Sequence, residues 1–139
     1  SIQTISNAMD VGNPSNFARI LDLYEQDFSA ITRDITPAVI DDKSTAESIK
    51  RVFQETGYTL DPHGAVGYLA LENYLKTSPE SSGIFLETAH PAKFKDVIDP
   101  ILGTDLELPS ALLEAYSKES RSLKISPEYS ELKRILLSK

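Results

Sequence analysis

Residues 60–86, LDPHGAVGYLALENYLKTSPESSGIFL, carry the pattern from which we predict the fold class. Asp61-Pro62 is a helix start, with an aspartate as the cap and a proline at the first helical position. The run from Ala65 to Leu75 is apolar nearly all the way round, which is typical of a helix that is buried on most sides. Gly83 to Leu86 is short and apolar, as in a core strand. The stretch therefore predicts a buried helix followed by a strand.

Helix and strand signals alternate on the N-terminal side of this stretch. Ser44 to Glu47 forms a capping box, and Gly57 is a C-terminal stop, so a helix is predicted between them. Ile35 to Ile40 is β-branched but is interrupted by a proline, which favours a short edge strand. Ile2 to Ile5 also alternates apolar and polar residues. We therefore expect an α/β fold with a partial parallel sheet, flanking helices and a helical C-terminal end.

Four further helices are predicted by apolar spacing and start signals. One follows a Ser15 cap and has a single buried face, formed by Phe17, Ile20, Leu21, Tyr24 and Phe28. A broken helix is expected over residues 92–102, and two amphipathic helices over 109–120 and 127–137. We expect one domain, residues 1–139, with an α/β part at 1–104 and the helical end at 105–139. Only three or four candidate strands are present, which is few for a doubly wound sheet.

Composition excludes several classes of function. The 139 residues include 21 acidic and 14 basic side chains, for a net charge of -7. Binding to nucleic acid or to an anionic membrane needs clustered cations, so neither partner is expected. The absence of cysteine excludes disulfides, thiolate metal sites and a cysteine nucleophile. No apolar run is long enough to span a bilayer and no signal peptide is visible, so we expect a cytoplasmic protein.

Three polar segments lie where predicted elements begin or end. They are residues 9–17 (MDVGNPSNF), 60–67 (LDPHGAVG) and 87–94 (ETAHPAKF). Ligands of α/β proteins bind outside the carboxyl ends of the strands, so these segments are expected to converge on one crevice. The residue types alone do not name a ligand, and a structural role for each segment is the alternative.

Other kinds of site have weaker support. His63 and His90 could each serve a serine hydrolase, but the Gly-x-Ser-x-Gly motif is absent, so hydrolysis is a minor alternative. The two histidines belong to different elements, and no metal site is expected. Neither a Walker motif nor Gly-x-Gly-x-x-Gly is present. Lys93 and Lys95, on either side of Phe94, are typical of surface lysines at a helix start.

Taken in order, the three segments resemble those of the threonine synthases. These are pyridoxal-phosphate enzymes of the tryptophan-synthase-β fold type, also called fold type II. The resemblance extends over the whole chain but corresponds only to the C-terminal portion of the enzyme. It implies conversion of O-phospho-L-homoserine and water to L-threonine and phosphate, with pyridoxal 5'-phosphate as the electron sink.

The resemblance also implies roles for individual residues. Thr88 occupies the position at which the family places a hydroxyl near the pyridine nitrogen, so it is the expected cofactor-binding residue. The expected substrate-binding residues are Asn13, Ser15, Asn16, Arg19, His90 and Lys93. No catalytic residue is expected in this chain, because the Schiff-base lysine of the family follows an upstream His-x-Phe-type motif that is absent here. The loop for the cofactor phosphate is absent too, so the chain alone is expected to be inactive.

Two hypotheses about partners remain open. If the chain is the C-terminal portion of the enzyme, its partner is the missing N-terminal part of the same protein, and a large apolar surface is exposed where that part packs. Such a surface would also permit self-association into a homo-oligomer. The alternative is a stand-alone, non-catalytic α/β domain that binds a small anion or a protein, and it predicts an ordinary surface.

Overall fold

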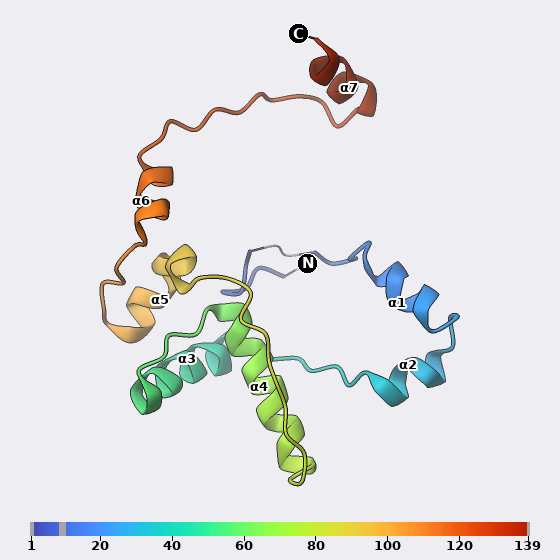
Figure 1. Ribbon diagram of the computed structural model, residues 1–139, viewed down its shortest axis with the longest axis vertical. Coiled ribbons are helices and arrows are strands. Elements are labelled where there is room, and N and C mark those ends of the chain that lie inside the picture. The colour runs from blue at the N-terminus through green and yellow to red at the C-terminus, as the bar shows by residue number, and fades with distance from the viewer. Residues whose placement is uncertain (1, 9–10, 139) are drawn as a thin grey trace. The chain divides into compact units, whose positions relative to one another are not determined.

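The computed structural model describes residues 2–8 and 11–138, and over these residues the chain forms helices joined by irregular segments (Figure 1). The chain divides into two units, one ending at Glu107 and the other beginning at Leu108. No helix in the described ranges is long and apolar enough to cross a membrane.

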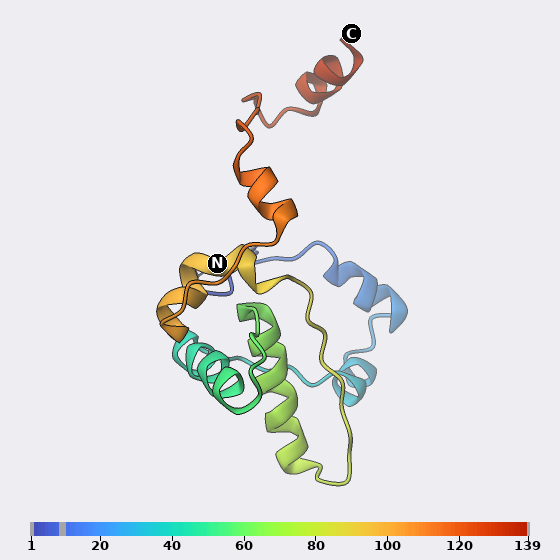
Figure 2. The same ribbon diagram turned by 60° about the vertical axis from the view of Figure 1, so that its left-hand side comes forward.

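The core of the first unit lies between three helices, α3 (Asp42–Thr56), α4 (Pro62–Thr77) and α5 (Lys95–Leu102). Figures 1 and 2 show α3 and α4 lying against each other. The apolar stripe predicted for α3 faces this core. The buried cluster consists of Ile49, Val52, Leu60 and Ala65. Burial of such side chains is the main contribution to the stability of this unit.

The ends of α3 and α4 are set by local capping. Asp41 accepts a hydrogen bond from the Ser44 N–H (2.7 Å), so α3 begins at Asp42 and the predicted capping box at Ser44 is wrong. The Ser44 amide is the group that is capped, because the aspartate supplies an acceptor one turn earlier. Gly57, at φ 75°, ends the helix as predicted. Asp61 and Pro62 begin α4, which confirms that prediction.

The predicted α/β fold is wrong, because no strand forms within the described residues. Residues 35–40 and 83–86 are irregular, and neither segment makes backbone hydrogen bonds to another extended segment in the described part of the chain. Val39 is 98% exposed and Ile84 is 91% exposed, so their apolar side chains pack against nothing here. A strand needs a neighbouring strand to pair with its N–H and C=O groups, and the residues that the structure describes supply none to these segments.

The segment that holds Gly83 to Leu86 runs back alongside α4 (Figures 1 and 2). The Phe85 ring meets the Tyr68 ring of the helix edge-on with centroids 5.5 Å apart, and Gly83 lies against the Leu71 side chain. A groove of about 600 Å³ lies between the segment and α4. The helix is consequently less buried than its composition predicts, and only its first turn holds fully buried residues.

Polar contacts add a second connection between α3 and α4. The Arg51 guanidinium lies 2.9 Å from a Glu72 carboxylate oxygen and 3.7 Å from one of Glu55. It also lies over the Tyr68 ring, 5.6 Å from the centroid. This arrangement combines an ion pair with a cation–π contact across the two helices. Because the groups are partly exposed, each contact contributes about 1 kcal/mol or less.

The helix predicted to span Phe17 to Phe28 is two helices, α1 (Phe17–Leu23) and α2 (Phe28–Asp34). The chain breaks between them because Glu25 and Gln26 adopt positive φ angles of 50° and 60°, which no helix continues. The single buried face predicted from periodicity is therefore wrong. Phe28 is 75% exposed.

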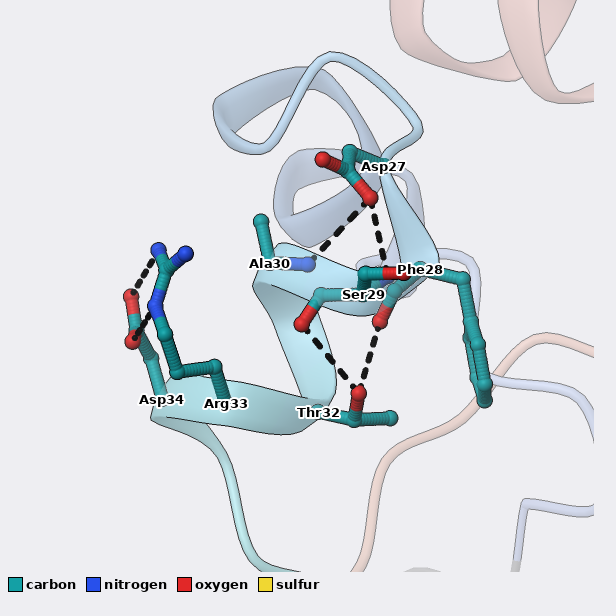
Figure 3. A network of polar contacts seen from close by, with 7 residues as sticks. All are labelled: Asp27, Phe28, Ser29, Ala30, Thr32, Arg33 and Asp34. Atoms are coloured by element: carbon teal, nitrogen blue, oxygen red, sulfur yellow. Dashed lines mark hydrogen bonds and ion pairs between the residues drawn. The ribbon is translucent and has the colours of Figure 1, made fainter.

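A local polar network supports α2, whose Ile31 side chain is buried. Asp27 accepts hydrogen bonds from the N–H groups of Ser29 (2.8 Å) and Ala30 (3.2 Å), as Figure 3 shows. The Thr32 hydroxyl donates to backbone carbonyls of the preceding turn, and Arg33 pairs with its neighbour Asp34. The Phe28 ring points away from this network in Figure 3. Capping thus defines a short helix whose aromatic side chain has no core to fill.

The second unit contains two short helices, α6 (Ser110–Tyr116) and α7 (Tyr129–Leu137). Both fall inside the ranges predicted from sequence. The Ser126 N–H donates to a Glu131 carboxylate oxygen (3.1 Å), so the chain folds back onto the first turn of α7. No described residue of either helix is buried, so packing within this unit contributes little.

Candidate functional site

The second and third polar segments singled out in the sequence meet at the N-terminus of α4, whereas no hydrogen bond or ion pair joins the described residues of the first segment, 11–17, to this helix. The Ala8 N–H donates to His63 Nε2 (3.2 Å), which joins the end of residues 2–8 to the second segment. The Asp61 N–H donates to Glu87 Oε1 (2.7 Å), which joins the second segment to the third. The His63 ring also lies 4.9 Å from the Phe94 ring, centroid to centroid. Met9 and Asp10 of the first segment lie outside the described residues.

Asp61 is the centre of this meeting point. It is fully buried, and one carboxylate oxygen accepts from both the His63 N–H and the His63 ring Nδ1 at 2.8 Å. The first bond caps α4, and a carboxylate at this position is further stabilised by the positive end of the helix dipole. Because His63 Nε2 accepts from Ala8, its proton must be on Nδ1, and the imidazole is neutral.

Glu87 lies against the same end of the helix. Its Oε1 accepts from the Asp61 N–H, while Glu87 Oε2 and Asp61 Oδ2 are both buried with no hydrogen-bond partner among the described residues. Burial, followed by its hydrogen bond to Asp61, raises the pKa of Glu87 to about 7. For Asp61, burial acts to raise the pKa, but hydrogen bonds from Glu87 and His63 outweigh it and the pKa is lowered. One proton on Glu87, donated to Asp61, therefore satisfies both buried oxygens.

Gly64 makes room for the Glu87 carboxyl group. A Cβ atom at this position would overlap the carboxyl carbon and both oxygens of Glu87. A Cβ at Gly67, one turn further along α4, would meet nothing within 4 Å. The glycine at position 64 is thus required by a close approach.

Thr88 follows Glu87 directly. It is exposed, and its hydroxyl has no hydrogen-bond partner over residues 2–8 and 11–138. His90 caps the short 3-10 helix η1 (Pro91–Phe94), where its Nδ1 accepts from the Ala92 N–H (3.1 Å). In the neutral ring this leaves the proton on Nε2, as a donor toward solvent or a ligand. The third segment thus presents a hydroxyl and an imidazole N–H close together in the sequence.

The two lysines beside Phe94 differ in their surroundings. Lys95 pairs with Asp99 (2.6 Å) and Asp105, and it donates to the Leu106 carbonyl (2.8 Å). Lys93 is exposed, with no ion pair in the described part of the chain. Lys95 therefore holds the turn after α5, whereas the ammonium group of Lys93 is available to an anion.

The remaining candidate residues lie at the start of α1. Asn13, Ser15, Asn16 and Arg19 are all exposed. The cap position belongs to Asn16, not to Ser15 as predicted. The N–H groups of the first turn of α1 donate to backbone carbonyls of the preceding turn, and no side-chain cap bond forms within the described residues. No hydrogen bond or ion pair among the described residues joins these four side chains to α4 or to Thr88.

The other chemistries considered from sequence find no support. Neither histidine has a hydrogen bond to a serine among the described residues, so no serine hydrolase dyad is assembled. No cluster of three metal-binding side chains occurs in those residues either. The pairing of Asp61 with Glu87 was missed from sequence. The sequence feature that could have indicated this pairing is Gly64, a glycine in the first turn of a helix with a strong cap.

Comparison with known proteins identifies relatives. A family model described as "Threonine synthase, C-terminal" matches residues 64–136. The threonine synthase of Escherichia coli is 36% identical over 135 residues, and that of Buchnera aphidicola subsp. Baizongia pistaciae is 40% identical over 139. These alignments cover 97% and 100% of this chain but 31% of each relative. The chain thus spans about a third of the length of these curated relatives.

Solved structures lead to the same group of proteins. The crystal structure of threonine synthase from Escherichia coli matches 98% of this chain with a TM-score of 0.82 at 36% identity. A threonine synthase from Brucella melitensis with bound PLP matches 85% of the chain with a TM-score of 0.60 at 26% identity. The match covers 31% of the first structure and 30% of the second. The fold described here therefore occurs as one part of larger proteins.

Proposed function

The chain belongs to the threonine synthase C-terminal family, and from this premise we propose that it forms the C-terminal part of an enzyme that makes L-threonine and phosphate from O-phospho-L-homoserine and water. The observation that carries the proposal is the end-to-end match to a third of two threonine synthases. The exposed apolar side chains support it. Val39, Ile84 and Leu86, in irregular segments, are each more than three-quarters exposed, as expected where a further part of a protein packs.

Pyridoxal 5'-phosphate is the proposed cofactor, and Thr88 is the residue of this chain proposed to hold its pyridine nitrogen. The fit rests on the exposed hydroxyl of Thr88, which has no hydrogen-bond partner among the described residues, and on the anchored side chain of Glu87 beside it. When bound, the cofactor supplies an electron sink for elimination and addition at the substrate carbons. A neutral hydroxyl donates a hydrogen bond to an unprotonated ring nitrogen, whereas a carboxylate would favour the protonated ring.

The substrate phosphate is proposed to meet the exposed polar residues of the first and third segments. Arg19 and Lys93 supply positive charge and have no ion pair among the described residues. His90 offers its Nε2–H, and Asn13, Ser15 and Asn16 offer neutral donors. In a chain of net charge -7, cations that form no ion pair among the described residues are the groups that attract a dianion.

The lysine that binds the cofactor is proposed to lie in the part of the enzyme that this chain does not include. We expect no stoichiometric adduct when the chain is mixed with pyridoxal 5'-phosphate and reduced with borohydride, as read by mass spectrometry. The full-length protein should show one adduct outside this chain, and it should release phosphate from O-phospho-L-homoserine while the chain alone does not. A single-site adduct at Lys93, or turnover by the chain alone, would contradict the proposal.

Replacement of Lys93 by alanine is expected to raise the KM of the full-length enzyme for O-phospho-L-homoserine by about 10–100-fold, because a charge-assisted hydrogen bond contributes about 1.5–3 kcal/mol. Lys93→Arg should restore most of the affinity. The matched control is Lys95→Ala, two residues away. It should lower thermal stability by loosening the Asp99 and Asp105 contacts, with less effect on KM. Equal KM values for the Lys93→Ala and wild-type enzymes would remove Lys93 from the substrate site.

A further inference from the structure

We propose that Glu87 is a positioning residue, whose carboxyl group holds Thr88 in place by sharing a proton with Asp61 at the N-terminus of α4. The inference rests on the proposed function, because Thr88 matters only if it contacts the cofactor. It adds a role for a buried pair of acids, and it predicts how that role depends on pH.

The first argument is that little else holds this part of the chain. Residues 82–89 make no backbone–backbone hydrogen bonds in the described structure. The segment contacts α4 and its cap through the Phe85 ring against Tyr68 and the Glu87 carboxyl against the Asp61 N–H, and the Leu71 side chain packs against Gly83. Glu87 is adjacent to Thr88, so anchoring its carboxyl group also restrains the backbone that carries the Thr88 hydroxyl.

The second argument is the fit of the Glu87 carboxyl group to its site. Gly64 leaves space that a Cβ would fill, and the Asp61 amide donates to Oε1. Glu87 Oε2 is then buried beside the carboxyl group of Asp61. If both acids are ionised, neither Glu87 Oε2 nor Asp61 Oδ2 has a hydrogen-bond donor among the described residues. A proton on Glu87 turns two unpaired acceptors into a donor and an acceptor.

The third argument comes from the other groups that face the pair. Tyr58 lies near both acids, since burial and then the charges of Glu87 and Asp61 raise its pKa. His63 is neutral and already bonded to Asp61 and Ala8. No lysine or arginine forms an ion pair with either acid in the described ranges. Without a cation, the pair can be stable only with fewer than two negative charges.

The sign of the pH dependence follows from which acid keeps the proton. Asp61 is the ionised partner, because its pKa is lowered by hydrogen bonds and it caps the helix. Glu87 binds the proton below a pKa of about 7, against an ordinary value of 4.5. The shared proton therefore holds the Glu87 carboxyl against Asp61 below neutral pH. Above neutral pH, two carboxylates face each other. Glu87, which has fewer contacts than Asp61, is then displaced together with Thr88.

The test uses the full-length protein without cofactor and with pyridoxal 5'-phosphate. NMR of isotope-labelled glutamate should show the Glu87 carboxyl titrating near pH 7 in the cofactor-free protein. If binding requires the protonated acid, cofactor affinity should fall by about tenfold between about pH 6 and pH 8. Glu87→Gln, whose amide replaces the O–H donor and cannot ionise, should remove this fall. Glu87→Ala should bind weakly at both pH values.

The outcomes separate the two proposals. A Glu87 pKa near its ordinary value would overturn the shared proton, whatever the protein does. Identical pH profiles of cofactor affinity for wild type and Glu87→Gln would overturn the positioning role. Titration of the cofactor itself is common to both proteins, so it cancels in this comparison. If no variant binds pyridoxal 5'-phosphate, the proposed function fails and the positioning of a cofactor contact fails with it, while the NMR titration still decides whether the proton is shared.

Discussion

Replacing Asp61 by alanine is expected to lower the free energy of unfolding by about 3 kcal/mol. The substitution removes the cap of α4 and the acceptor for the His63 ring, and it takes away the partner of the buried Glu87 oxygen. Each of these groups lies at the end of the helix that meets the core. The change should be measured by urea denaturation followed by circular dichroism.

Asp41→Ala is the matched control for this prediction. Asp41 also caps a long helix and also accepts one backbone N–H, from Ser44, but it is exposed. Its loss should cost about 1 kcal/mol, the usual value of a cap. The difference between the two variants measures what the buried contacts of Asp61 contribute. Equal losses would show that Asp61 is only a cap and would contradict the buried network.

Gly64→Ala is expected to destabilise the protein by about 2 kcal/mol, although alanine is the better helix former. The new methyl group would overlap the Glu87 carboxyl and force it out of its site, leaving the Asp61 amide unpaired. Gly67→Ala, in the same helix but facing open space, should instead stabilise by about 0.5–1 kcal/mol. The opposite signs of the two changes should be visible in thermal denaturation.

A double-mutant cycle tests whether the overlap with Glu87 is the cause. In a Glu87→Ala background the methyl group at position 64 has no carboxyl to displace. Gly64→Ala should then stabilise, as Gly67→Ala does, and the coupling between positions 64 and 87 should exceed about 1 kcal/mol. The same loss from Gly64→Ala in both backgrounds would show that the cost arises elsewhere in the helix.

The sequence predicted correctly those helix ends that depend on residues within one turn of each other. The Asp61-Pro62 start and the Gly57 stop were confirmed, because a cap, a fixed proline φ and a left-handed glycine act within one turn of the chain. The family was also identified correctly from three short motifs in order, and the family model and relatives confirm it. The roles expected of Thr88 and of the substrate-binding residues remain predictions.

Predictions that depended on distant partners failed. Ile35 to Ile40 and Gly83 to Leu86 have the composition of strands, but in the described structure they have no neighbour with which to pair. The spacing of apolar residues from Phe17 to Phe28 predicts one helix, but Glu25 and Gln26 adopt positive φ angles and divide it into two. The pattern of apolar residues indicates which side chains are suited to burial. It does not indicate whether another segment is present to pack against them.

The sequence by itself determined the C-terminal end of α3, the start of α4, the three motifs and the family to which they belong. Only the tertiary structure showed that the second and third motifs meet at the start of α4, that Gly64 accommodates Glu87, and that Glu87 and Asp61 form a pair. Those two acids are 26 residues apart in the chain. Their shared proton depends on burial and on the lack of an ion pair to a lysine or arginine among the described residues, and both are properties of the folded surroundings.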